Sequence, residues 1–246
     1  MDMALSTRSM EIPAPFIVAP TGRWEGNDGN WSTFAFTVGS PAQHFRGLPS
    51  LIGLEIWVPM TPDACVNVMA DQIECMFSRG AVDGGFMSNT SSTWSQIDIF
   101  QLPDQAYLYG QDNNALFGTD DVTLAGVDGS TLSCTAQTVA GFATTDFWMG
   151  TFGLGVNHTA FGGSVHPSFL ALLRDQSSIP SLSFGYTAGA SYEASHGSLV
   201  LGGYDEACFE ATNLSVPIVR DSGSLRLMVQ KCRTEERGKS SALALR

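Results

Sequence analysis

The protein has 246 residues, of which 43% are hydrophobic and 15% charged, and its formal net charge is −12 at neutral pH. This length suffices for one large or two small domains with a substantial core. With 26 glycines and few charges, the composition predicts a globular chain of many short strands and tight turns. No stretch approaches 18 consecutive apolar residues, so we expect no transmembrane helix.

Most of the chain has the pattern of β-strands. Residues 31–38 alternate apolar and polar side chains, as a half-buried strand should. Residues 122–124 and 137–142 read as further strands between turns rich in Gly, Asp and Ser, and strands at 183–186 and 198–201 follow. The sequence therefore predicts a mainly β fold.

One short helix interrupts this pattern. Its apolar side chains recur at helical spacing, namely Val165, Phe169, Leu172 and Leu173. Pro167 suits a first helical turn and Ser164 could cap the N-terminus. We expect the helix to end before Ile179 and Pro180.

Charge divides the chain near residue 220. Residues 220–246 hold seven basic and three acidic side chains, which leaves five basic and 21 acidic in the preceding 219 residues. A basic tail can bind nucleic acid or anionic lipid, but this one lacks interleaved aromatic residues and an amphipathic period. We therefore interpret it as a divergent or mis-spliced C-terminus and expect no nucleic-acid partner.

The chain also has features of secreted proteins. It contains four Asn-x-Ser/Thr glycosylation sequons, at Asn30, Asn89, Asn157 and Asn213. It is acidic and poor in lysine, as many extracellular acid-adapted proteins are. Residues 1–8 lack an apolar core long enough for a signal peptide, and we expect that segment to be missing because the sequence starts late. We favour a secreted or cell-surface protein.

Several segments resemble motifs of the pepsin-like aspartic peptidase family. Residues 36–43 are similar to its "hydrophobic-Gly-Thr-Pro-x-Gln" strand and turn, and residues 56–59 to its "Leu-Trp-Val" strand. Residues 149–155 resemble its "Asp-Gly-Ile-Leu-Gly-Leu" strand, and residues 197–205 its "Gly-x-Leu-x-Leu-Gly-Gly-x-Asp" hairpin. Their order and spacing match together, and residues 24–31 resemble a divergent fungal group. The resemblance implies one lobe of the bilobal pepsin-like fold, mainly β with one short helix.

Ser50 lies where this family has its first catalytic aspartate. The position is seven residues after Gln43 and seven before Trp57, which are the family's own spacings. Aspartic proteases use two carboxylates that share one proton, and a serine hydroxyl cannot take that part because it does not ionise near the working pH. In addition, Ile52 replaces the glycine that lets backbone amides approach the carboxylates in the family. We therefore expect no catalytic residue at this position.

The sequence also has no segment that matches the family's second catalytic aspartate at the expected spacing. Asp221 begins an Asp-Ser-Gly sequence, but it follows Val216 by only five residues, where the family has some two dozen. Met149 stands where the family often has an aspartate. Tyr109 is the candidate for the family's flap tyrosine, with Tyr107 competing for that role.

The five cysteines include one pair that the resemblance places in a disulfide. Cys65 and Cys75 lie where the family has a small disulfide loop, and no zinc-like spacing competes with it. Cys134, Cys208 and Cys232 have no evident mates, and a small buried thiol is the favoured reading of Cys134.

Searches for other chemistry find no alternative site. The phosphate-loop, zinc-protease and hydrolase motifs are absent, and His44, His158, His166 and His196 are scattered. Ser50 as a nucleophile would need an adjacent base, and none can be named. We expect no metal and no cofactor.

The sequence predicts a three-part organisation. Residues 1–22 form an extension, residues 23–219 a pepsin-like N-terminal lobe, and residues 220–246 the basic tail, with the C-terminal lobe missing. The favoured function is that of a non-catalytic pseudoprotease with a peptide or glycan ligand. The alternatives are an aspartic endopeptidase represented by an incomplete or mis-spliced chain and a truncated product that does not fold stably, because half of a bilobal fold exposes apolar surface. Oligomeric state has no sequence signal.

Overall fold

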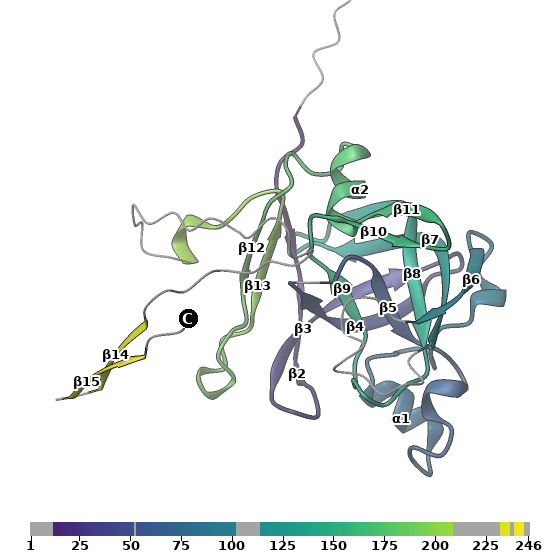
Figure 1. Cartoon of the computed structure of the whole chain (residues 1–246), viewed down its shortest axis with the longest axis horizontal. Helices are drawn as coiled ribbons and strands as arrows, with labels where there is room; N and C mark the ends of the chain where they lie inside the picture. Colours follow the sequence, from purple (N-terminus) through teal and green to yellow (C-terminus); the bar gives the residue numbers. More distant parts are fainter. Residues whose placement is uncertain (1–11, 52, 102–113, 209–231, 237–238, 244–246) are drawn as a thin grey trace, which may run out of the picture.

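A computed structural model shows a mainly β chain with two short α-helices (Figure 1). The structure describes residues 12–51, 53–101, 114–208, 232–236 and 239–243. The strands are β1 (Phe16–Val18), β2 (Pro20–Glu25), β3 (Trp31–Val38), β4 (Gln43–Ser50), β5 (Ile56–Pro59), β6 (Ser95–Gln101), β7 (Asn114–Ala125), β8 (Thr131–Phe142), β9 (Thr151–Gly153), β10 (His158–Phe161), β11 (Ser164–Pro167), β12 (Phe184–Thr187), β13 (Ser198–Leu201), β14 (Cys232–Glu236) and β15 (Lys239–Leu243). The helices are α1 (Gln72–Ser78) and α2 (Phe169–Asp175).

The central element is an eight-stranded sheet with the order β2-β3-β4-β9-β5-β8-β7-β6. An additional pairing of β3 with β7 curls this sheet back on itself like a barrel. In β3, Phe34, Phe36 and Val38 are buried on the inner face, whereas Ala35 and Thr37 lie half-buried on the outer face. The alternation of apolar and polar residues thus gives the strand two faces, as the sequence predicts.

The other predicted strands lie inside longer ones or match them closely. Residues 122–124 lie in β7 and residues 137–142 in β8, which pair antiparallel along most of their length. The predicted strands at 183–186 and 198–201 correspond to β12 and β13. The prediction of a mainly β fold is confirmed.

The helices differ from the prediction in number and in one boundary. Helix α2 begins at Phe169, and its N-cap is Ser168, whose hydroxyl accepts a hydrogen bond from the Ala171 amide. Val165 and Pro167 belong instead to β11, which pairs with β10. Helix α1, which the sequence analysis missed, begins after Asp71, whose carboxylate caps it by accepting from the amides of Ile73 and Glu74.

A second sheet with the order β1-β13-β12 stands beside the first (Figure 1). Because β1 pairs with β13 and β2 pairs with β3, the fold begins before residue 23, inside the segment interpreted as an extension. The hairpin of β14 and β15 projects away from the body in Figure 1. No helix in the described ranges is both long and apolar enough to span a membrane.

Candidate functional site

Ser50 ends β4 at the place where three strands of the main sheet meet. Strand β9 pairs parallel with β4, with Gly153 opposite Ser50, and antiparallel with β5. The carbonyl of Ser50 accepts a hydrogen bond of 2.8 Å from the Leu154 amide, and the carbonyl of Gly53 accepts one of 2.9 Å from Gly155. The turn after β4 is therefore fixed by a strand that lies about a hundred residues later in the chain.

The side chain of Ser50 has a defined partner in this turn. Its Oγ accepts a hydrogen bond of 2.9 Å from the Gly53 amide. A Cβ atom at Gly53 would lie 2.8 Å from that oxygen, so any larger residue would force the side chain of Ser50 to move. The close approach of an amide to position 50 is thus provided by Gly53. Ile52, for which the sequence suggested the loss of such an approach, lies outside the described residues.

In the part of the chain that the structure describes, the hydroxyl of Ser50 has a backbone amide as its hydrogen-bond partner. Within the described ranges, its Oγ has no hydrogen bond to a carboxylate or an imidazole, only the bond from Gly53. A serine hydroxyl becomes a nucleophile when an adjacent base takes its proton. The arrangement can hold a backbone turn and accept an amide proton, but it holds no acid–base pair at this atom.

Two buried residues, Glu55 and Met149, lie close in the chain to the strands that build the Ser50 turn. Glu55 lies five residues further on and is 2% exposed, and its carbonyl accepts a hydrogen bond of 3.0 Å from Gly153. Because this contact is made by the backbone, the side-chain identity of Glu55 gave no signal for it. Met149, which stands where the family often has an aspartate, is buried beside the residues that lead into β9.

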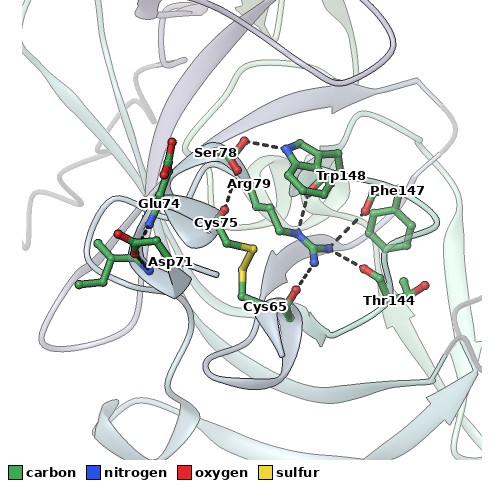
Figure 2. The surroundings of a disulfide bond; sticks show 11 residues. Cys65, Asp71, Glu74, Cys75, Ser78, Arg79, Thr144, Phe147 and Trp148 are labelled. Atoms are coloured by element: carbon green, nitrogen blue, oxygen red, sulfur yellow. Dashed lines mark hydrogen bonds between the residues drawn. A yellow bond between two sulfur atoms is a disulfide. The ribbon is translucent and has the colours of Figure 1, made fainter. Parts of the chain in front are cut away.

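The segment before β9 is anchored by a buried arginine (Figure 2). Arg79 donates from Nε to the Trp148 carbonyl at 3.0 Å, from Nη2 to the carbonyls of Thr144 and Phe147, and from Nη1 to the Ala64 carbonyl. Trp148 in turn donates from its indole to the Ser78 carbonyl at 3.0 Å. Helix α1 and the approach to β9 are therefore tied together.

The charge of Arg79 has no carboxylate partner within the part of the chain that the structure describes. Its guanidinium lies near the rings of Phe142 and Trp148, with its carbon about 5.2 and 5.3 Å from the two ring centroids. Burial lowers the pKa of Arg79 from 12.5 to about 10, so the group remains a cation at neutral pH.

The disulfide implied by the resemblance is present next to this arginine. The sulfur atoms of Cys65 and Cys75 are 2.01 Å apart, and the bond joins the residues that follow β5 to helix α1 (Figure 2). Cys134 is buried in the core, and burial raises the pKa of its thiol to about 12, as expected for an inert thiol.

The remaining predicted residues do not gather around Ser50. The side chains of Asn30, Asn89 and Asn157 are exposed at separate places on the surface. Tyr107, Tyr109, Asn213 and Asp221 lie outside the described residues, as do the side chains of Cys208 and Cys232.

The histidines likewise form no common site. His44 pairs with Asp83, and His196 stacks on Trp24 with 4.8 Å between the ring centroids. Across the described ranges, no group of three or more His, Cys, Asp or Glu side chains is placed to hold a metal ion.

Comparison with known proteins identifies the family. Residues 34–242 match the family model described as eukaryotic aspartyl protease, a range that covers most of the chain and continues past residue 219. The search of curated proteins found no match. The matched range contains β3, β4, β5 and β9, which together build the turn at Ser50. On this match and this architecture, the chain belongs to the eukaryotic aspartyl protease family.

Proposed function

We propose that the protein is a non-catalytic member of this family, a pseudoprotease. The observation that carries the proposal is Ser50, whose hydroxyl accepts the Gly53 amide proton at the position of the first catalytic carboxylate. Two carboxylates that share a proton are the working parts of an aspartic protease. With a hydroxyl in place of one of them, water has no base to activate it, although the backbone turn is kept.

We further propose that the domain holds a peptide without cleaving it. In support, Leu51 follows Ser50 directly and its side chain is 43% exposed, which leaves an apolar contact beside the turn. An extended peptide could use such a contact together with main-chain hydrogen bonds. A glycan ligand has no comparable support, because the exposed residue beside Ser50 is the apolar Leu51.

The test of the catalytic proposal is a cleavage assay. The full chain is incubated with denatured haemoglobin at pH 3 to 4, with pepsin as the positive control, and products are followed by mass spectrometry. We expect no cleavage by the wild type, and none by Ser50→Asp, because a single restored carboxylate still lacks its partner. Cleavage by the wild type that pepstatin blocks would show instead an active aspartic-type endopeptidase.

The peptide proposal needs a separate binding measurement. Pepstatin, a peptide-like molecule, is titrated into the wild type and into Leu51→Ser by calorimetry. We expect binding to the wild type and a loss of several-fold in affinity in the variant. Equal affinities, or no binding at all, would refute a peptide-holding role and leave the non-catalytic proposal standing.

We also propose that the protein follows the secretory route. The disulfide between Cys65 and Cys75 supports this, because such bonds persist in oxidising compartments. The exposed asparagines of three sequons are compatible with attached glycans. Expression in a eukaryotic secretory host, followed by enzymatic removal of N-glycans, should lower the mass of the protein, and an unchanged mass would contradict the proposal.

A further inference from the structure

A cavity of about 690 Å³ lies on the outer face of the main sheet, away from Ser50. Its floor is the outer side of β3, where Ala35 and Thr37 are small and only half-buried. Strands β2, β4 and β7 and the residues after α1 contribute the walls. This volume is within the range of about 300–1,000 Å³ that is usual for small-molecule sites.

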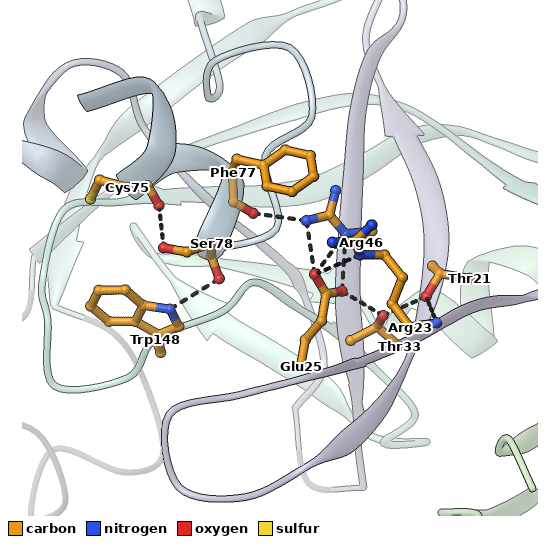
Figure 3. Close-up of polar contacts among 9 residues, drawn as sticks. All are labelled: Thr21, Arg23, Glu25, Thr33, Arg46, Cys75, Phe77, Ser78 and Trp148. Atoms are coloured by element: carbon orange, nitrogen blue, oxygen red, sulfur yellow. Dashed lines mark hydrogen bonds and ion pairs between the residues drawn. The ribbon is translucent and has the colours of Figure 1, made fainter. Parts of the chain in front are cut away.

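Two arginines line this cavity, Arg23 from β2 and Arg46 from β4 (Figure 3). Only five basic residues precede residue 220, so the cavity collects two of the few cations of a strongly acidic region. Both guanidinium groups lie near the ring of Phe77, with their carbon atoms 5.1 and 4.2 Å from its centroid. The pair is therefore held in place by helix α1 as well as by the sheet.

One carboxylate, that of Glu25, serves both arginines (Figure 3). It accepts from the Nε of Arg46 at 2.9 and 3.0 Å, from the hydroxyl of Thr33 at 2.8 Å, and lies 3.4 Å from the Nε of Arg23. Arg46 also donates from Nη2 to the Phe77 carbonyl at 2.8 Å. The acceptor capacity of Glu25 is thus taken up mainly by Arg46.

The acid that lines the cavity itself, Asp83, is paired with His44. Asp83 accepts from the backbone amide of His44 at 3.2 Å and from its ring Nδ1. By contrast, within the described ranges neither Nη atom of Arg23 makes a hydrogen bond or an ion pair, and its side chain is 51% exposed. A guanidinium carries five N–H donors, so the Nη donors of Arg23 remain available to a ligand in the cavity.

We propose that this cavity binds a small organic anion with an apolar body and one carboxylate. The carboxylate pairs with the free edge of Arg23, where a planar two-pronged contact is possible. The apolar body lies on Ala35 and Ala125 and against Val82, which are among the apolar residues that line the cavity. The site is independent of Ser50 and of any peptide-binding role.

The test compares a charged probe with a neutral one of the same shape. Binding of 2-naphthoate and of 2-naphthamide to the full chain is measured by calorimetry at constant ionic strength. We expect the carboxylate to bind about tenfold more tightly, as a charge-assisted hydrogen bond to an exposed arginine allows. Equal affinities for the two probes, or no binding of either, would overturn the proposal.

Three variants locate the binding. Arg23→Gln should reduce naphthoate affinity about tenfold, to the level of the amide. Ala35→Leu fills the cavity floor and should abolish binding of both probes, with thermal unfolding to confirm that the variant is folded. Arg174→Gln is the matched control, because Arg174 pairs with Asp175 in α2 and lies outside the cavity. If Arg174→Gln weakens naphthoate binding as much as Arg23→Gln does, net charge rather than the cavity is responsible and the proposal fails.

Discussion

Arg79 and Arg46 are both buried, yet the two regions around them satisfy a guanidinium in opposite ways. Arg46 faces a carboxylate, that of Glu25, and adds one carbonyl. Arg79 has only carbonyls and ring faces around it within the described chain. A carboxylate neutralises a charge at one point, whereas several carbonyls can bind it only if separate loops converge on it. The first arrangement links β2 to β4 across β3, and the second organises the approach to the Ser50 turn.

The largest effect should come from replacing Arg79 by methionine. Four carbonyl groups then lose a donor, at about 1–3 kcal/mol for each one left unsatisfied, while the cost of burying a charge is recovered. We expect a net loss of about 3–5 kcal/mol in the free energy of unfolding, measured with urea. Arg174→Met, at an exposed pair, serves as the control. A variant as stable as the wild type would show that desolvation of the charge outweighs its hydrogen bonds.

The second-largest effect is expected from removal of the disulfide. It also tests whether Arg79 and the disulfide stabilise the same part of the chain, around Ala64 and Cys65. Cys65 and Cys75 are ten residues apart, and closing a loop of this length is worth about 2–3 kcal/mol. Cys65→Ala with Cys75→Ala should therefore destabilise the fold by that amount in urea. Combined with Arg79→Met, the losses should not add, because Arg79 holds the carbonyl of Ala64 next to Cys65. Strict additivity would mean that the two devices are independent.

Glu25→Gln tests the other side of the comparison. The amide keeps one acceptor for Arg46 but removes the carboxylate charge that pairs with it. We expect a loss of about 1–2 kcal/mol in urea unfolding, the difference between a charged and a neutral hydrogen-bond partner. If Glu25→Gln lowers the free energy of unfolding as much as Arg79→Met does, the ion pair of Arg46 is as important to the whole fold as Arg79 is, and not only to the link between β2 and β4.

The smallest effect concerns the exposed pair of His44 and Asp83. The hydrogen bond from His44 lowers the pKa of Asp83 below 3.8. Since the folded pKa is the lower one, the pair contributes stability above pH 3.8 that is lost as the pH falls through the folded value. Both side chains are more than half exposed, so this contribution is small. In His44→Gln the pKa of Asp83, followed by carboxyl NMR, should rise towards its ordinary value, and an unchanged pKa would rule out His44 as the cause.

The sequence predicted the strands well because their signal is local. Residues 31–38 alternate between the core and the surface, and that pattern is visible without any tertiary contact. The assignment of Ser50 to the family's first catalytic position rests on a different signal, the spacing of the motifs on both sides of it, and it stays a prediction.

The helices were harder to predict because their boundaries depend on competing local signals. Ser164 and Ser168 are both possible caps, and pairing of β11 with β10 decides in favour of Ser168. Helix α1 has little apolar face, since Ile73 is 79% exposed and Phe77 39% exposed, and a disulfide holds it instead. No periodicity reveals a helix of this kind.

The contacts of Arg79 and of Gly53 could not be predicted from sequence. Three of the four carbonyls that Arg79 meets lie 65 to 69 residues away, and any residue type provides a carbonyl. Gly53 matters because its backbone lies close to the side chain of Ser50. This closeness depends on the pairing of β9 with both β4 and β5. Backbone partners leave no trace in the identity of side chains.

The insertion of β9 between β4 and β5 also has a consequence for the order of folding. Its partners Leu48 and Trp57 lie roughly a hundred residues earlier in the chain, and contacts of such large sequence separation form slowly. During synthesis, β4 and β5 must wait for residues 151–153 before the turn between them can close. The Ser50 turn therefore closes only after residue 153 is made, and a nascent chain that stops before residue 151 leaves one edge of each strand without its β9 partner.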